Sequence, residues 1–441
     1  MTHRPGQPGN AGVPPALDDR PPSMTASTSS PGGSAGVPPA LVGRAAASTS
    51  PPPLARRMAR VTASAIMELI KTTAGGNYIS FASGLPDPAL FPVDRVRELA
   101  DAVLTEDGRA ALQYGPAEGY PPLRALIAET LRGRGLAAGP ENILITNGSQ
   151  QALDLAVRAL LNPGEGVVLE NPSYLAAVQA FDSYEARYHV LPLDDGGMVT
   201  EALPAALAER PALAYTLPNF QNPTGLTLTG ERRAELAEAI AGAGIALLED
   251  DAYHDLRFEG DSLPSVCALA ENPRAVYCGT LSKTIAPGLR VGYLCAEASL
   301  VVRLGQLKQI TDLHTGSFTQ RIVYRYCERG WLEPGIRAFC ESYRRRRDVL
   351  LEALAAELTG IVRWTRPAGG MFVWVTLPEG HHTGALLEQA MRRGIVFVPG
   401  ASFHPGGGGE NTLRLNFVSA TEEKIREGIG ILSGVIRESL A

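Results

Sequence analysis

The sequence predicts an α/β protein, with an open and mostly parallel sheet followed by a smaller α+β domain. Its length of 441 residues allows two or three domains and a large buried core. Short apolar segments alternate with helical ones over roughly 150 residues, which is typical of open α/β sheets. The pattern then changes to one long helical stretch and three further strands, which favours a separate smaller domain.

The candidate strands of the larger domain are continuous apolar runs bounded by turn residues, as expected for strands covered on both faces. They span residues 143–146, 167–170, 212–217, 245–249, 275–280 and 290–296. Helical patterns lie between them, for example over 150–161 and 231–241, and two more precede them, over 63–71 and 92–105. This order predicts strands connected by helices that cross over the sheet.

The C-terminal part begins with a helical stretch over 319–358 and continues with strand patterns over 371–377, 395–399 and 412–417. Helical patterns between and after these strands favour an α+β arrangement. The long stretch contains four consecutive arginines, 344–347, between Glu341 and Asp348. Mixed charges in a helical pattern indicate a solvated helix face rather than a binding patch.

The first 53 residues have a different composition from the rest. They are rich in Pro, Ala, Ser and Gly, and the sequence AGVPPAL occurs at 11–17 and again at 35–41. Such a segment buries too little apolar surface to offset the entropy of ordering. We predict a passive disordered tail, with a transit-like or partner-binding segment as the alternative.

Composition excludes several classes of protein. The formal net charge is −6 and no basic block occurs, which argues against a nucleic-acid partner. No apolar run approaches the ~18–20 residues that a membrane-spanning helix needs. The five cysteines form no CxxC pair and no His stands at zinc-finger spacing, so we expect no metal site and reduced thiols in a cytoplasmic protein.

Lysine is scarce, and one of the lysines has unusual neighbours. The four lysines are Lys71, Lys283, Lys308 and Lys424. Lys283 follows an apolar strand within GTLSKTIAPGLRVG, with Thr280 and Ser282 before it and Arg290 after a Pro-Gly turn. Two hydroxyls and a guanidinium are suited to binding a phosphate dianion beside a reactive amine. A partly desolvated lysine can act as nucleophile and base.

Three further motifs follow predicted strands. The sequence TNGSQQA at 146–152 joins a strand to a helix whose first N–H groups form an anion site, although many such turns are simple helix caps. NPTG at 222–225 is, taken alone, a turn. EDDAY at 249–253 places carboxylates at the carboxyl end of a core strand, where open α/β sheets bind ligands. Asp250 by itself is equally consistent with a helix N-cap.

In this order the motifs resemble the fold-type I family of enzymes that depend on pyridoxal 5′-phosphate (PLP), specifically the class I/II aminotransferases. The resemblance runs from about residue 60 to the end. It is strongest to the 2-aminoadipate, aromatic and multi-substrate subgroup, through SFASGLP at 80–86, LQYGP at 112–116, PNFQN at 218–222 and GGMFVW at 369–374. The resemblance implies the PLP-dependent transferase fold, with a seven-stranded, mixed but mostly parallel sheet. It also implies a large PLP-binding domain over 91–325 and a small domain formed by 54–90 and 326–441.

The family implies roles for matching residues. Lys283 would hold PLP covalently, Asp250 would pair with the pyridine nitrogen, and Tyr253 would act with them in catalysis. Tyr253 and Asn222 would bind the ring oxygen, and Tyr174 would stack on the ring. The phosphate would be held by Ser149, Gln150, Thr280, Ser282 and Arg290, with Tyr114 reaching in from the second subunit of a homodimer. The substrate would be bound by Arg414, Asn222, Gly84 and Met67, with Arg414 clamping the α-carboxylate.

The implied activity is ping-pong transfer of an amino group from an L-amino acid to a 2-oxo acid such as 2-oxoglutarate. Met67 stands where the subgroup often carries an arginine for a distal carboxylate, which favours an aromatic or hydrophobic donor over 2-aminoadipate. A fold-type I β-lyase or decarboxylase remains the alternative, because these enzymes share the cofactor residues. A PLP-binding transcriptional regulator is not favoured, because residues 1–53 lack a winged-helix pattern and a basic helix.

Overall fold

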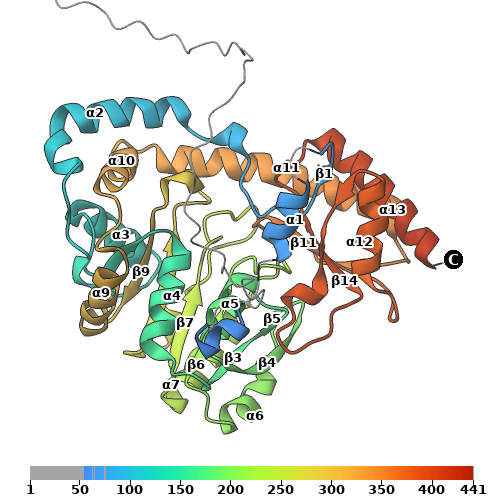
Figure 1. Ribbon diagram of the computed structural model, residues 1–441, viewed down its shortest axis with the longest axis horizontal. Coiled ribbons are helices and arrows are strands. Elements are labelled where there is room, and N and C mark those ends of the chain that lie inside the picture. Colours follow the sequence, from blue (N-terminus) through green and yellow to red (C-terminus); the bar gives the residue numbers. More distant parts are fainter. Residues whose placement is uncertain (1–53, 62, 64, 74–75, 441) are drawn as a thin grey trace, which may run out of the picture. The chain divides into compact units, whose positions relative to one another are not determined.

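The largest sheet has eight strands, in the order β2-β9-β8-β7-β6-β3-β4-β5 (Figure 1). The computed structural model describes residues 54–440 except 62, 64, 74 and 75, so the predicted tail, 1–53, lies outside the described residues. The strands are β2 (Ile143–Thr146), β3 (Gly166–Asn171), β4 (Arg187–Asp194), β5 (Gly197–Met198), β6 (Leu213–Thr216), β7 (Ala246–Asp250), β8 (Ala275–Thr280) and β9 (Gly292–Ala296).

This sheet is mixed but mostly parallel, as the sequence predicted. The pairs β3–β4, β3–β6, β6–β7 and β7–β8 are parallel, whereas β9 runs antiparallel to both neighbours and β5 antiparallel to β4. All six predicted strands are present. The strand β4 was missed because its residues are mostly exposed or only partly buried and include Pro192, so no continuous apolar run marks it. The two-residue β5 extends the expected seven strands to eight.

Helices bury both faces of this sheet, which explains its continuous apolar strands. One face packs against α4 (Ser149–Leu160), α5 (Leu175–Asp182) and α9 (Ala298–Asp312). The other packs against α2 (Val93–Ala111), α3 (Pro121–Gly133), α6 (Leu203–Ala208), α7 (Gly230–Ala243), α8 (Val266–Leu269) and α10 (Ser317–Glu328). The carboxyl ends of β3, β6, β7 and β8 therefore lie at one edge between two helical layers.

A second sheet is antiparallel and has four strands, in the order β10-β11-β14-β13. They are β10 (Arg363–Trp364), β11 (Phe372–Thr376), β13 (Val398–Pro399) and β14 (Thr412–Asn416). With α11 (Leu332–Leu358), α12 (Thr383–Arg392) and α13 (Glu422–Leu440) this sheet surrounds a separate apolar core. In Figure 1 these elements form the orange and red end of the chain.

The N-terminal segment joins this second core. Strand β1 (Ile79–Ser80) pairs in parallel with β12 (Ile395–Val396), and Phe81 is fully buried in the same cluster as the residues of α11 and α13. Upstream, the helix predicted over 63–71 is present as α1 (Ala65–Thr73), two residues further along the chain. The division at 90/91 and 325/326 stays a prediction, because residues 54–441 form one compact unit.

Two features of the long helical stretch differ from the prediction. It is two helices, α10 and α11, separated at Gly330, whose φ of +70° suits glycine and ends the first helix. The arginine run is not a solvated face throughout. Arg347 is buried and donates to the carbonyl of Pro367, and Arg346 pairs with Asp87 at 2.6 Å. Contacts with distant segments bury Arg347 and partly bury Arg346, and the charges of neighbouring residues in the sequence do not reveal such contacts. No helix in the described ranges is long and apolar enough to cross a bilayer.

Candidate active site

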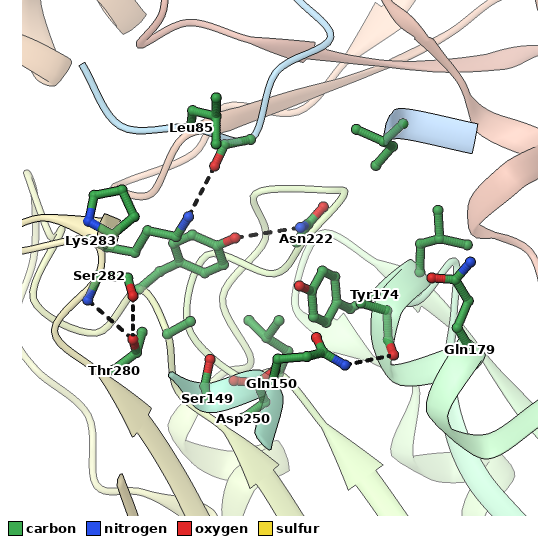
Figure 2. Close-up of a pocket in the computed structure, with 18 of the residues that line it drawn as sticks. Leu85, Ser149, Gln150, Tyr174, Gln179, Asn222, Asp250, Thr280, Ser282 and Lys283 are labelled. Carbon is green, nitrogen blue, oxygen red and sulfur yellow. Dashed lines mark hydrogen bonds between the residues drawn. The ribbon is translucent and has the colours of Figure 1, made fainter. Parts of the chain in front are cut away.

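A cavity of about 420 Å³ lies at the carboxyl edge of the large sheet (Figure 2). Asp250 ends β7, Thr280 ends β8, and Ser149 begins α4 directly after β2. Every predicted site residue except Tyr114 lines the cavity: Met67, Gly84, Ser149, Gln150, Tyr174, Asn222, Asp250, Tyr253, Thr280, Ser282, Lys283, Arg290 and Arg414. Residues from 67 to 414 thus meet at one place.

Lys283 extends into the cavity from the loop after β8. Its ammonium donates to the carbonyl of Gly84 at 3.0 Å, a contact across 199 positions of sequence (Figure 2). The pKa of the Lys283 amine is lowered to about 8, mainly by burial and additionally by the positive charges of Arg414 and Arg290. About 10–20% of the amine is therefore neutral near physiological pH, far more than for an ordinary lysine, as a nucleophile or base requires.

Asp250 is a buried carboxylate with one free oxygen. Its Oδ2 accepts a hydrogen bond from the hydroxyl of Tyr215 at 3.2 Å, whereas its Oδ1 has no partner among the described residues. Burial raises the pKa of Asp250 to about 7, although the bond from Tyr215 opposes this rise. A cationic donor at Oδ1 would satisfy the orphaned oxygen and keep the carboxylate ionised.

Hydroxyl and guanidinium groups gather on the other side of Lys283. The hydroxyl of Thr280 donates to that of Ser282 at 2.9 Å (Figure 2). Arg290 donates to the carbonyl of Asn147 at 2.9 Å. Helix α4 has no side-chain cap at Gly148, so its first N–H groups remain open. Gly148 has φ of +75°, and a Cβ there would lie 2.4 Å from Nη2 of Arg290. Only glycine leaves space for this guanidinium, and together these groups form an anion cradle.

Arg414, on β14, forms the opposite wall. It is almost fully buried, donates to Asn222 Oδ1 at 2.8 Å and to the carbonyl of Ala82 at 2.7 Å, and lies 4.2 Å above the ring of Phe372. Burial lowers the pKa of the Arg414 guanidinium to about 10, which leaves it charged at neutral pH. A buried guanidinium facing a cavity is suited to a carboxylate ligand.

The tyrosines of the cavity are neutral. Burial raises the pKa of Tyr174 to about 12 and the pKa of Tyr253 well above its usual range. Asn222 donates to the hydroxyl of Tyr253 at 3.4 Å and at the same time accepts from Arg414. Asn222 therefore connects the tyrosine of one wall to the arginine of the other.

Comparison with known proteins identifies the family. Residues 77–432 match the family model described as aminotransferase class I and II. The chain belongs to this family.

Two named relatives and one solved structure are 40% identical or more to this chain. The aminotransferase is 43% identical to aromatic-amino-acid aminotransferase 1 of Thermococcus litoralis, over 86% of this chain and 92% of the relative. It is 42% identical to 2-aminoadipate transaminase of Thermus thermophilus, over 87% of this chain and 96% of that relative. Its structure matches the crystal structure of Pyrococcus horikoshii kynurenine aminotransferase in complex with PMP, with a TM-score of 0.84 and 40% identity. The match covers 88% of this chain and 98% of the other. The predicted fold, enzyme class and PLP cofactor are confirmed.

The residues of this aminotransferase fit PLP on grounds of their own chemistry. The cofactor carries an aldehyde, a pyridine nitrogen and a phosphate dianion. The cavity offers an amine of lowered pKa at Lys283, an orphaned carboxylate oxygen at Asp250 and an anion cradle at Arg290. Each group of the cofactor has a chemically complementary partner in one cavity.

The aminotransferase cavity also has an apolar end that the sequence analysis missed, apart from Met67. Ile66 and Met67 reach it from α1, and Leu175 and Ala176 reach it from α5. In sequence, apolar residues on these two helices look like ordinary core positions. Only the approach of α1 to α5 shows that they face a ligand space. Further missed lining residues are Leu85, Gln179, Leu217, Ala252 and Pro287.

Tyr114 does not reach the cavity of its own chain. Its side chain is 76% exposed and meets the ring of His314 edge-on at 5.7 Å between centroids. It borders a smaller cavity with Ser317 and Gln320. The predicted contact with PLP in a second subunit therefore stays a prediction.

The lowered pKa of Lys283 predicts how PLP capture depends on pH. Only the neutral amine attacks an aldehyde, so the capture rate of cofactor-free protein should rise roughly tenfold per pH unit below about 8 and level off above it. Stopped-flow absorbance measures this rate. A parallel pH series with Nα-acetyllysine, which keeps a free side-chain amine, corrects for the ionisation of PLP itself. A midpoint near that of an ordinary lysine would contradict the lowered pKa.

Proposed function

We propose that this aminotransferase moves the amino group of an aromatic or hydrophobic L-amino acid to a 2-oxo acid such as 2-oxoglutarate in a ping-pong reaction. The supporting observation is one cavity that combines the Lys283 amine, the Arg414 guanidinium and the apolar end at Met67. An amino acid placed with its carboxylate on Arg414 and its side chain toward Met67 brings its α-carbon near the reactive amine.

Each residue then has a task in the reaction. Arg414 forms two parallel hydrogen bonds to the α-carboxylate and orients the α-carbon toward Lys283. The Lys283 amine, with a pKa of about 8, accepts a proton from that carbon and returns it. When bound, PLP supplies an electron sink for the negative charge that develops at the α-carbon. Asp250 keeps the pyridine nitrogen protonated, which strengthens this sink.

The other residues hold the cofactor in place. Ser149, Gln150, Thr280, Ser282 and Arg290 bind the phosphate, Tyr174 stacks on the ring, and Tyr253 and Asn222 donate to the ring oxygen. The raised pKa of Tyr253 supports this role, because a neutral phenol keeps its proton for donation. Because Asn222 also contacts Arg414, cofactor and substrate carboxylate are oriented by one shared side chain.

The apolar end supports a hydrophobic donor. Among the described residues that line the cavity, the guanidinium groups are those of Arg290 and Arg414, and both are assigned above to phosphate and α-carboxylate. A distal carboxylate such as that of 2-aminoadipate would lose water without gaining a cationic partner. The relative named for aromatic amino acids supports this proposal, whereas the relative named for 2-aminoadipate keeps that donor as the second candidate.

A donor panel with 2-oxoglutarate tests the substrate class. We expect kcat/KM for phenylalanine to exceed that for 2-aminoadipate at least about tenfold. Met67→Arg should raise kcat/KM for 2-aminoadipate relative to that for phenylalanine roughly 1.4- to 5-fold, because a half-exposed ion pair contributes only about 0.2–1 kcal/mol. The matched control is Glu68→Arg, at the next residue, which is exposed and pairs with Lys71.

Three outcomes of the panel would contradict the proposal. Preference for 2-aminoadipate in the wild-type chain would exclude the hydrophobic donor. Release of ammonia or carbon dioxide, without glutamate, would indicate a β-lyase or decarboxylase. An equal effect of both arginine variants would exclude a specific contribution of position 67.

We propose further that the enzyme is a cytoplasmic homodimer with shared active sites. Exposed apolar side chains around Tyr114 and at the end of α9 support the dimer: Leu112, Tyr114, Ile310 and Leu313. All five cysteines are free in the described structure, which is typical of a reducing compartment.

Sedimentation measures the mass of the assembly and so tests the dimer. If Tyr114 serves the partner's site, mixing Lys283→Ala with Tyr114→Ala chains should restore some activity. A monomer, or no restoration in proven mixed dimers, would contradict shared sites.

A further inference from the structure

A buried lysine outside the cavity forms an ion pair next to the phosphate cradle. Lys308, on α9, has a fully buried side chain and pairs with Asp312 one turn further along the helix. Its ammonium donates to both oxygens of Asp312, at 2.9 and 3.0 Å, and to Oε1 of Gln151 at 2.8 Å. All three N–H groups of the ammonium are used, as burial of a lysine requires.

Asp312 connects this pair to the turn before α4. Its Oδ2 accepts from the side-chain amide of Asn147 at 2.5 Å and from that of Gln151 at 2.7 Å. The Oε1 of Gln151 also accepts from the backbone N–H of Asn147 at 2.8 Å. The side-chain amide of Asn147 is thus held directly by α9, and its backbone N–H is held by Gln151 of α4, which contacts Lys308 and Asp312 in turn.

The backbone carbonyl of Asn147 faces the cradle. It accepts from Nη2 of Arg290 at 2.9 Å, and the next residue is Gly148, which leaves space for that guanidinium. Arg290 itself has φ of +53°, a backbone conformation that few side chains adopt without support. The contacts thus run without interruption from Lys308 through Asp312 and Asn147 to Arg290.

We propose that Asp312 and Lys308 are positioning residues for the cofactor phosphate. They hold the peptide of Asn147 so that the guanidinium of Arg290 and the first N–H groups of α4 are preorganised for a dianion. The pairing also has an electrostatic reason. A lone carboxylate at position 312 would repel the phosphate, and the ammonium of Lys308 offsets its charge. This proposal rests on the assignment of Arg290 to the phosphate.

Comparing PLP with pyridoxal, which lacks the phosphate, tests the proposal on the full chain after removal of its cofactor. In Asp312→Asn, and in the neutral double variant Lys308→Met/Asp312→Leu, the dissociation constant for PLP should rise roughly tenfold, whereas that for pyridoxal should change less than twofold. The control is Thr311→Val. Thr311 accepts from Arg158, so it also joins α9 to α4, but it has no contact with Asn147.

The outcomes separate positioning from a purely structural role. Equal weakening of PLP and pyridoxal, or no change in either, would overturn the proposal, and so would an equal effect of Thr311→Val. If Asp312→Asn does not fold, the neutral double variant decides by the same ratio. Failure of both to fold would assign the pair to stability and overturn the proposal. A wild-type chain that binds PLP and pyridoxal equally would overturn the role of Arg290 itself, which is a different failure.

Discussion

Replacing Lys283 with alanine is expected to lower the transamination rate at least about 10⁴-fold, because the substitution removes both the covalent attachment of PLP and the proton acceptor near the α-carbon. The absorbance band of protein-linked PLP should disappear, while the fold should persist, since the Lys283 ammonium makes a single hydrogen bond to the described residues, to the carbonyl of Gly84. Steady-state kinetics and a spectrum of the purified protein measure the two effects.

The matched control for this variant is Lys424→Ala. Lys424 is exposed, pairs with Glu427 on α13 and does not line the cavity. Its replacement should leave both the spectrum and the rate unchanged. An unchanged spectrum in Lys283→Ala would move the attachment point to another lysine and contradict the active-site assignment.

Replacing Arg414 with alanine is expected to lower kcat/KM for every amino acid by roughly 10²–10⁴-fold. The substitution removes two charge-assisted hydrogen bonds to the α-carboxylate, each contributing about 1.5–3 kcal/mol. The loss should appear mainly as a higher KM and should be equal for donors that differ in their side chains, because all share the carboxylate. The PLP spectrum should remain, which separates this variant from Lys283→Ala.

Arg414→Lys is the informative control. It keeps the positive charge but loses the planar fork, so it should recover only part of the activity. Circular dichroism of both variants checks folding, because Arg414 is buried, lies over the ring of Phe372 and contacts Asn222. A loss confined to one class of side chain would show that Arg414 binds the side chain rather than the shared carboxylate.

Much of the cofactor site was predictable from local sequence. Asp250 ends a core strand, and Thr280 ends the neighbouring one, so the parallel sheet brings their carboxyl ends to one edge without further information. The turn at Gly148 follows β2 and opens α4 at the same edge. The six apolar strands were likewise readable, because each is buried on both faces and shows no polar alternation.

Contacts between distant segments were not predictable in this way. Strand β4 is only half-buried and lacks a continuous apolar run, so its pattern carried no strand signal. Arg346 and Arg347 belong to a charged helical run. In the structure, however, Arg346 forms an ion pair with Asp87, and Arg347 donates to the carbonyl of Pro367. The hydrogen bond from Tyr215 to Asp250 depends on the register of two strands, which composition does not specify.

The sequence by itself determined the fold class, the family and most of the residues that line the cavity, because these depend on strand ends and on motifs a few residues long. Tertiary structure alone decided which carbonyl receives the Lys283 amine, which helices form the apolar end and what supports Arg290. These features join residues up to 199 positions apart in the case of Gly84 and Lys283. Packing of whole helices and sheets sets such distances, and local propensity contains no information about them.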